Sequence, residues 1–97
     1  MANLIWGKVY YKEHFAGFLR EEPGERASFH IHDKTYFWTV VDEGHGLQHY
    51  PDGTWTTTHF RLGDTAYRVH TPEDPLIHDL ENVGDTTLRF VTVEFKR

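Results

Sequence analysis

The fold of this chain is decided by residues 24–44, which read GERASFHIHDKTYFWTVVDEG. The segment joins two runs that favour β-strands, Arg26–His32 and Tyr36–Asp42, through a short connection. Side chains two positions apart in a strand lie on the same face of a sheet, so His30 and His32 project into one space. Neutral imidazole is a common ligand for zinc, copper, iron and nickel. The segment therefore predicts β-structure and a metal-binding face together.

The rest of the sequence continues as short strands. Helical periodicity is nearly absent, and β-branched and aromatic runs alternate with glycine, proline and aspartate. We expect strands at 4–10, 15–19, 26–32, 36–42, 47–50, 54–60, 65–69, 76–81 and 88–95, turns at 21–24 and 43–46, and a hairpin turn at 51–53. Such regular spacing predicts an all-β sandwich or barrel. No linker or repeat interrupts the pattern, so residues 1–97 are expected to form a single domain.

Composition narrows the expected partners. The 97 residues carry 10 Lys and Arg against 15 Asp and Glu, a net charge of −5 with histidine neutral. Without a basic patch, neither nucleic acid nor an anionic membrane is expected as a partner. The absence of cysteine excludes disulfides, thiolate metal ligands and cysteine nucleophiles. No signal peptide and no apolar run of bilayer-spanning length is visible, so we expect a cytoplasmic location.

A third imidazole would complete a metal site that keeps open coordination positions. His78, in a downstream strand, is the first candidate. His70 and His59 are alternatives, since each lies in or just after a predicted strand. The histidines in or near predicted turns are expected to face solvent; they are His14, His45 and His49.

The first histidine segment resembles the first motif of the cupin superfamily. Gly24, His30 and His32 match the glycine and the His-x-His of that motif in type and spacing, and Gly44 or Gly46 supplies its closing glycine. The glutamate that usually follows the histidines is missing, and an aromatic residue stands in its place.

A later segment is similar to the second cupin motif. Gly63 opens it, and His78 and Asn82 end it with the expected spacing. Residues 73–75, Glu-Asp-Pro, replace the usual proline-x-glycine, and the loop is longer. Together the two motifs cover most of the chain.

The resemblance implies a cupin-type double-stranded β-helix, a jelly-roll barrel, with a divalent metal near its mouth. By the same resemblance His30, His32 and His78 are the metal ligands. Three neutral nitrogens without the glutamate look like the three-histidine iron centres of thiol dioxygenases and diketone-cleaving dioxygenases. Fe(II) is therefore the favoured metal, and Zn, Ni, Cu or Mn stay open because imidazole suits several of these ions.

Tyr36 is the candidate catalytic residue, because it would line the pocket and offer its hydroxyl to a metal-bound substrate; packing in the barrel wall is the alternative. Aromatic pocket walls are expected from Tyr36, Trp38, Phe29, Phe60 and Phe90. Asn82 is expected to shape the turn after its strand. Glu21 and Glu22 are expected in a loop, and Asp79 and Glu81 are expected to face water or a partner. Glu94 is expected to face solvent, with an inward carboxylate near the metal as the alternative.

Three functions fit this pattern. The first is a metal-dependent, dioxygenase-like enzyme acting on a small organic substrate. The second is a non-catalytic cupin module that binds a small ligand or a metal. The third is a metal-free isomerase in which the histidines act as general bases. The resemblance also implies a homodimer, and the apolar residues within 4–11 are compatible with one because an exposed apolar patch needs cover.

Overall fold

The computed structural model describes residues 7–10 and 14–95, and this part of the chain forms nine strands and no helix. The strands are β1 (Gly7–Tyr10), β2 (His14–Glu21), β3 (Arg26–His32), β4 (Tyr36–Asp42), β5 (Gly44–His49), β6 (Trp55–Phe60), β7 (Thr65–Arg68), β8 (Leu76–Asn82) and β9 (Leu88–Phe95). Strands β3, β4 and β9 have the predicted bounds. Residues 4–6 of the expected first strand lie outside the described residues. The described segments include no helix that could cross a bilayer.

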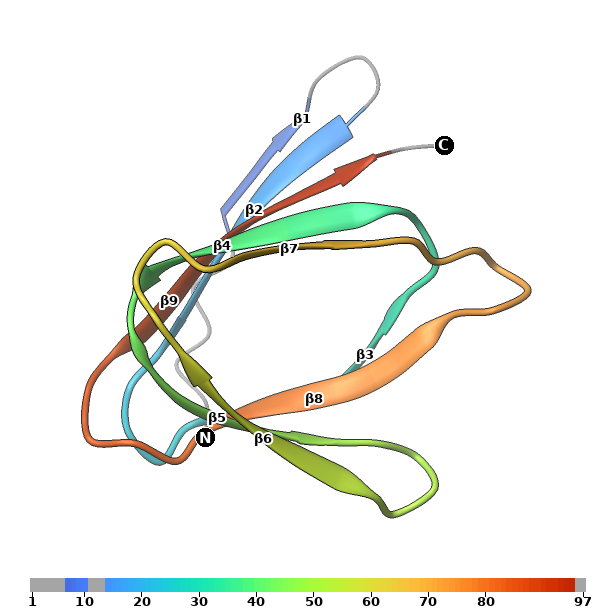
Figure 1. Cartoon of the computed structure of the whole chain (residues 1–97). Helices are drawn as coiled ribbons and strands as arrows, with labels where there is room; N and C mark the ends of the chain where they lie inside the picture. Colours follow the sequence, from blue (N-terminus) through green and yellow to red (C-terminus); the bar gives the residue numbers. More distant parts are fainter. Residues whose placement is uncertain (1–6, 11–13, 96–97) are drawn as a thin grey trace.

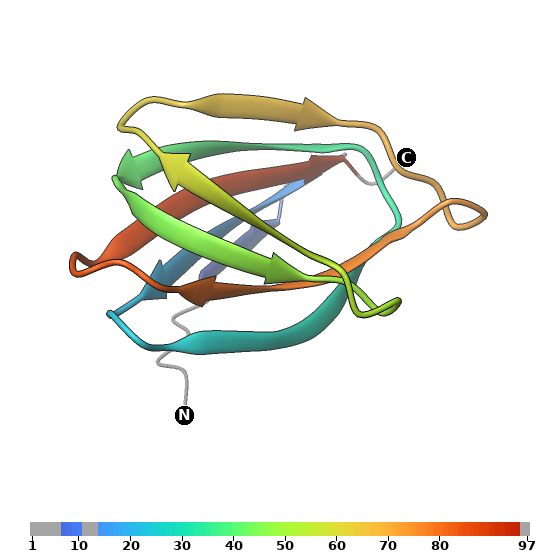
Figure 2. The same ribbon diagram turned by 60° about the horizontal axis from the view of Figure 1, so that its bottom comes forward.

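The strands form two antiparallel sheets that face each other around an interior (Figure 1). One sheet has the order β1-β2-β9-β4-β7 and the other the order β3-β8-β5-β6. Figure 2 shows the chain passing between the two layers, for instance from β3 to β4 and from β6 to β7. The all-β jelly-roll barrel expected from the sequence is confirmed.

Alternation along the strands builds the core. In β9 the side chains of Leu88, Phe90 and Thr92 are buried, and the residues between them are partly exposed. The same period of two fills the interior from both sheets. The buried apolar cluster consists of Val40, Phe60, Leu80, Leu88 and Phe90.

The predicted turn at 43–46 is wrong, because β5 starts at Gly44 and pairs with β6 over its whole length. A Cβ atom on Gly46 would lie 2.6 Å from Cε2 of Phe60 and 2.9 Å from Cδ1 of Leu80. Glycine at this position therefore allows close packing inside a strand. The predicted hairpin at 51–53 is confirmed, and Gly53 has the positive φ of 87° that its turn requires.

Glu21 was expected in a loop, but it ends β2 and its side chain is fully buried. Its Oε2 accepts a hydrogen bond from the Ala27 backbone N–H at 2.8 Å, and its Oε1 has no hydrogen-bond partner among the described residues. Burial raises the pKa of Glu21 to about 8. Asn82 shapes the adjoining turn as predicted: its Nδ2 donates to the carbonyl oxygens of Glu21 and Thr86, and its Oδ1 accepts from the Gly84 N–H.

Asp79 was expected to face solvent, but it is also fully buried. It lies on the outer face of β8, opposite to His78, where side chains from two neighbouring strands cover it. The Arg26 guanidinium pairs with it, and the His49 backbone N–H donates to it at 2.7 Å. Burial acts to raise its pKa, but the hydrogen bonds from His49 and Arg26 outweigh that effect and hold the pKa below its ordinary value.

Candidate metal centre

The three candidate histidines come from two neighbouring strands, β3 and β8. Ala27 pairs with Leu80, and His30 pairs with His78, with a register shift between the two pairs. The shift inserts one extra residue into β3. Ala27 lines the interior, so an unbroken ladder would turn the odd-numbered positions inward. Because a one-residue shift exchanges the faces of a strand, the irregularity turns His30 and His32 into the barrel.

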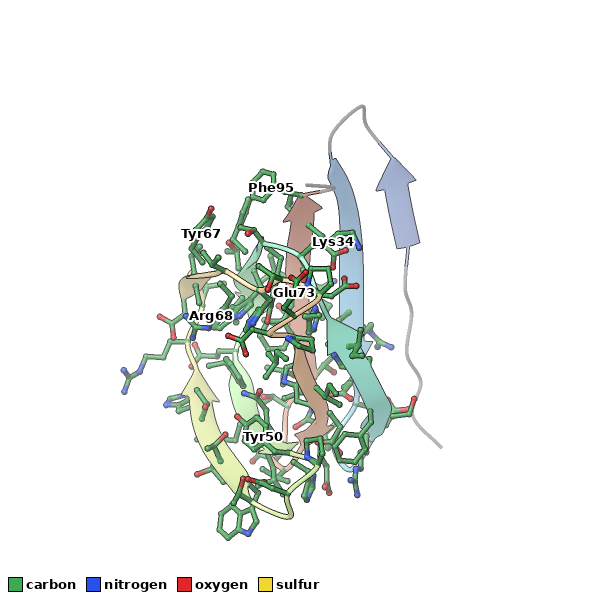
Figure 3. The ribbon with its side chains drawn as sticks, turned by 90° about the vertical axis from the view of Figure 1, so that its right-hand side faces the viewer. Lys34, Tyr50, Tyr67, Arg68, Glu73 and Phe95 are labelled. Atoms are coloured by element: carbon green, nitrogen blue, oxygen red, sulfur yellow. The ribbon has the colours of Figure 1, made fainter. Side chains whose placement is uncertain are left out.

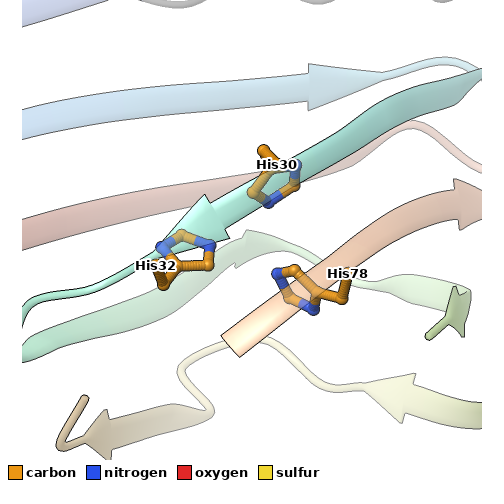
Figure 4. A group of neighbouring side chains, drawn as sticks. All are labelled: His30, His32 and His78. Carbon is orange, nitrogen blue, oxygen red and sulfur yellow. The ribbon is translucent and has the colours of Figure 1, made fainter. Parts of the chain in front are cut away.

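The three imidazoles share one space between β3 and β8 (Figure 4). A possible ligand atom from each of His30, His32 and His78 lies within 4.8 Å of the other two. The ring centroids are 4.9 Å apart for His30 and His32, 4.7 Å for His30 and His78, and 5.1 Å for His32 and His78. The structure therefore brings together the three histidines that the sequence singled out.

Hydrogen bonds orient two of these rings. Nδ1 of His30 lies 3.0 Å from the Ser28 carbonyl oxygen, and Nδ1 of His78 lies 2.6 Å from Oε1 of Gln48. Both oxygens only accept, so each Nδ1 donates its hydrogen, and Nε2 is the ring nitrogen that could bind a metal. Nδ1 of His32 is buried and has no hydrogen-bond partner among the described residues. Outer-shell partners of this kind fix the orientation of metal-binding histidines, so the donor set fits a divalent metal.

Burial keeps two of the three rings, His32 and His78, uncharged. It lowers the pKa of His32 to about 3, and the neighbouring His30 and His78 lower it further by charge repulsion. Burial, followed by repulsion from His30, lowers the pKa of His78 to about 4. These two imidazoles are neutral at pH 7, which is the state a metal requires of them.

Tyr36 lies directly against the histidines. Its ring stacks on His32 with a centroid distance of 4.3 Å and an interplanar angle of 15°. Burial raises the pKa of Tyr36 to about 12, so its hydroxyl stays protonated and can donate a hydrogen bond. His70 stacks on Tyr36 at 5.9 Å and lines the same pocket, but it is not part of the group of three.

His59, the other alternative ligand, lies away from this centre. Its ring is exposed, stacks on His45 at 4.4 Å and has its Nε2 3.4 Å from Oε2 of Glu43. The expectation that His49 faces solvent is wrong in part, because its ring contacts buried Asp79. The side chain of His14 lies outside the described residues.

Glu94 was expected to face solvent, but it points into the pocket. Its side chain is 14% exposed, and its Oε2 lies 3.9 Å from Nδ1 of His32. Glu94 shares the inward face of β9 with Phe90 and Thr92, and it pairs with Tyr36 across the sheet. The inward alternative, which alternation along β9 offered, is the one that the structure shows.

The histidines open into a pocket of about 680 Å³. Trp38, Phe60 and Phe90 line it as expected, whereas Phe29 is 47% exposed and does not. Gln48 is a lining residue that the sequence analysis missed. Figure 3 views the barrel end at which the loops after β3 and β7 lie, with Tyr50 and Arg68 of the pocket lining labelled. The pocket can hold a small organic molecule against the three imidazoles.

Several solved structures have a fold similar to that of this chain. A cupin domain from Bordetella pertussis is 23% identical, covers 97% of this chain and 94% of its own, and superposes with a TM-score of 0.84. A double-stranded β-helix protein from Klebsiella pneumoniae is 23% identical, with coverages of 96% and 76% and a TM-score of 0.74. A sugar phosphate isomerase of the cupin superfamily from Silicibacter pomeroyi is 20% identical, with coverages of 89% and 52% and a TM-score of 0.61.

These likenesses show that the chain has the cupin fold. No protein-family model matches the chain, and no curated protein matches it by sequence. A shared fold does not fix an activity, so the function has to be argued from the site itself.

Proposed function

We propose that this protein is a metal-dependent enzyme for a small organic substrate, with a divalent metal, Fe(II) by preference, held by His30, His32 and His78. The observation that carries the proposal is the approach of three imidazoles within 4.8 Å, with burial lowering the pKa of two of them, beside a pocket of about 680 Å³. Three ligands leave coordination positions open for a substrate.

The protein's own groups would divide the work. His30 and His78 present Nε2, since their Nδ1 hydrogens are already bound by Ser28 and Gln48. A bound divalent metal would polarise a substrate oxygen, and Fe(II) would add reactivity toward dioxygen. We propose Tyr36 as the catalytic residue, with its protonated hydroxyl donating to a substrate oxygen.

Metal analysis tests this proposal. Protein purified without chelator should contain a stoichiometric transition metal, and His78→Ala should lose it while circular dichroism stays that of a folded barrel. His59→Ala is the matched control, because His59 is exposed and outside the group of three. A wild-type protein that binds no metal at neutral pH contradicts the proposal.

Turnover assays distinguish a metal-dependent enzyme from a binding module and from a metal-free isomerase. With Fe(II) loaded, an enzyme consumes dioxygen in the presence of a substrate, and Tyr36→Phe should slow that reaction without lowering the metal content. A metal-loaded protein that converts nothing would be a binding module. One structural neighbour is described as a sugar phosphate isomerase, and the second candidate function is a metal-free isomerase. Its activity would survive EDTA.

We further propose that the protein is a cytoplasmic homodimer. Phe29 and Ile31 are 47% and 57% exposed on the outer side of β3, and an apolar patch of this kind favours a partner surface. Light scattering at the elution peak measures the oligomeric state, and cell fractionation measures the location. A monomeric mass would contradict the dimer.

A further inference from the structure

The pocket continues past the histidines into the apolar part of the barrel. We call this inner part of the pocket the apolar chamber. The residues that line it are Leu19, Ala27, Trp38, Phe60, Leu80 and Phe90. Four of these side chains, Ala27, Phe60, Leu80 and Phe90, are 3–7% exposed. The site is therefore more than a polar cleft at the barrel mouth.

Polarity changes in the same direction along three strands. On β8, His78 is followed two positions on by Leu80; on β4, Tyr36 is followed by Trp38. On β9 the inward positions run from Glu94 through Thr92 to Phe90. Because residues two apart face the same side of a strand, each strand carries a polar group at the mouth and an apolar group deeper in the barrel.

Aromatic rings make the chamber wall stiff. Trp38, Phe60 and Phe90 meet one another edge to face, with ring centroids 5.5, 5.6 and 4.9 Å apart. Aromatic side chains in such an arrangement offer large, fixed contact surfaces for an apolar or aromatic group. Ala27 leaves room beside them because its side chain is a single methyl.

We infer that the substrate of this site is amphipathic, with a chelating oxygen head at the three histidines and an apolar body of about the size of a ring in the chamber. The inference rests on the proposed metal function. A sugar or sugar phosphate would place hydroxyl groups against Leu80 and Phe90, where they would lose hydrogen bonds to water without replacement. The chamber therefore favours aromatic or branched aliphatic substrates.

Two hydroxamates test the inference, since they share a chelating head and differ in body. Co²⁺-loaded protein is titrated with acetohydroxamate and benzohydroxamate, and binding is followed in the visible Co²⁺ spectrum. Relative to their chelation of free Co²⁺, benzohydroxamate should bind roughly tenfold to a hundredfold more tightly, because the phenyl group buries more apolar area.

Filling the chamber should remove this preference. Leu19→Phe and, independently, Ala27→Val should bring the two affinities to within about threefold of each other while acetohydroxamate and Co²⁺ still bind. Leu62→Phe makes the same change as Leu19→Phe at a residue that is 68% exposed, and it should keep the preference.

The outcomes are distinguishable. The amphipathic substrate is overturned if the wild type binds both hydroxamates equally tightly. It is also overturned if the preference survives in Leu19→Phe and Ala27→Val proteins whose melting curves show a folded barrel. Either result leaves the metal function intact. Failure to bind Co²⁺ overturns both proposals.

Discussion

Replacing Glu21 by glutamine should remove a pH dependence of folding stability. The pKa of the carboxyl is raised by burial from 4.5 to about 8, so the folded protein holds a proton that the unfolded chain releases between these values. When the folded state binds more protons, stability falls as the pH rises. Glu21 therefore stabilises the fold near pH 5 relative to pH 8. At about 1.4 kcal/mol per pH unit, the difference over this interval is about 3 kcal/mol.

The assay is urea unfolding of the metal-free wild type and of Glu21→Gln at several pH values from about 5 to 8. The other titrating groups occur in both proteins, so the difference between the two stabilities isolates Glu21. That difference should move by about 3 kcal/mol in favour of the variant as the pH rises. Glu22→Gln is the control, because the Glu22 side chain is 37% exposed beside Arg20. Parallel pH profiles for wild type and Glu21→Gln would refute the reasoning.

Three further outcomes are expected. Gln48→Leu removes the acceptor of the His78 Nδ1 hydrogen and should weaken metal binding by roughly 10- to 100-fold, and Gln48→Glu should restore most of that affinity. Equal metal affinity of Gln48→Leu and the wild type in a competition titration would show that Gln48 does not position His78. Gly46→Ala should lower the free energy of unfolding in urea by about 1–3 kcal/mol. Gly44→Ala should lower it less, because the atom nearest to the added carbon is 3.3 Å away, and the reverse order would contradict the packing argument. Because the pKa of His32 is lowered to about 3, only the unfolded chain gains a proton at this residue as the pH falls below 6.5. The free energy of unfolding of the metal-free wild type should therefore fall by about 2 kcal/mol more than that of His32→Gln between pH 7 and pH 5. Identical losses in the two proteins would count against a buried neutral His32.

The fold and the histidine pair were predictable because they depend on local periodicity. β-Branched and aromatic runs bounded by turn residues predict the bounds of β3, β4 and β9, and the spacing of two places His30 and His32 on one face. The inward orientation of that face depends on the register shift in β3, for which the sequence has no local signal. The approach of His78 to His30 and His32 followed only from the cupin resemblance, since no local pattern brings β8 beside β3.

Contacts between distant strands account for what the sequence did not reveal. Alternation placed Asp79 opposite to His78, but its burial depends on Arg26 and His49 from two other strands. Gly46 was interpreted as a turn residue, whereas the rings and methyl groups that exclude a side chain there come from β6 and β8.

The role of Gln48 depends on a partner 30 residues away. Neither strand contains a local signal for this hydrogen bond. Sequence periodicity thus shows which side chains share a face, and tertiary pairing decides where that face points and what covers it.

The most direct test of the metal centre is a crystal structure of protein purified without chelator, with anomalous data collected at transition-metal absorption edges. The account predicts one strong anomalous peak about 2.0–2.2 Å from Nε2 of His30, Nε2 of His78 and a ring nitrogen of His32. A map with no peak there, or with the peak at His45 and His59 on the outer surface, would contradict it.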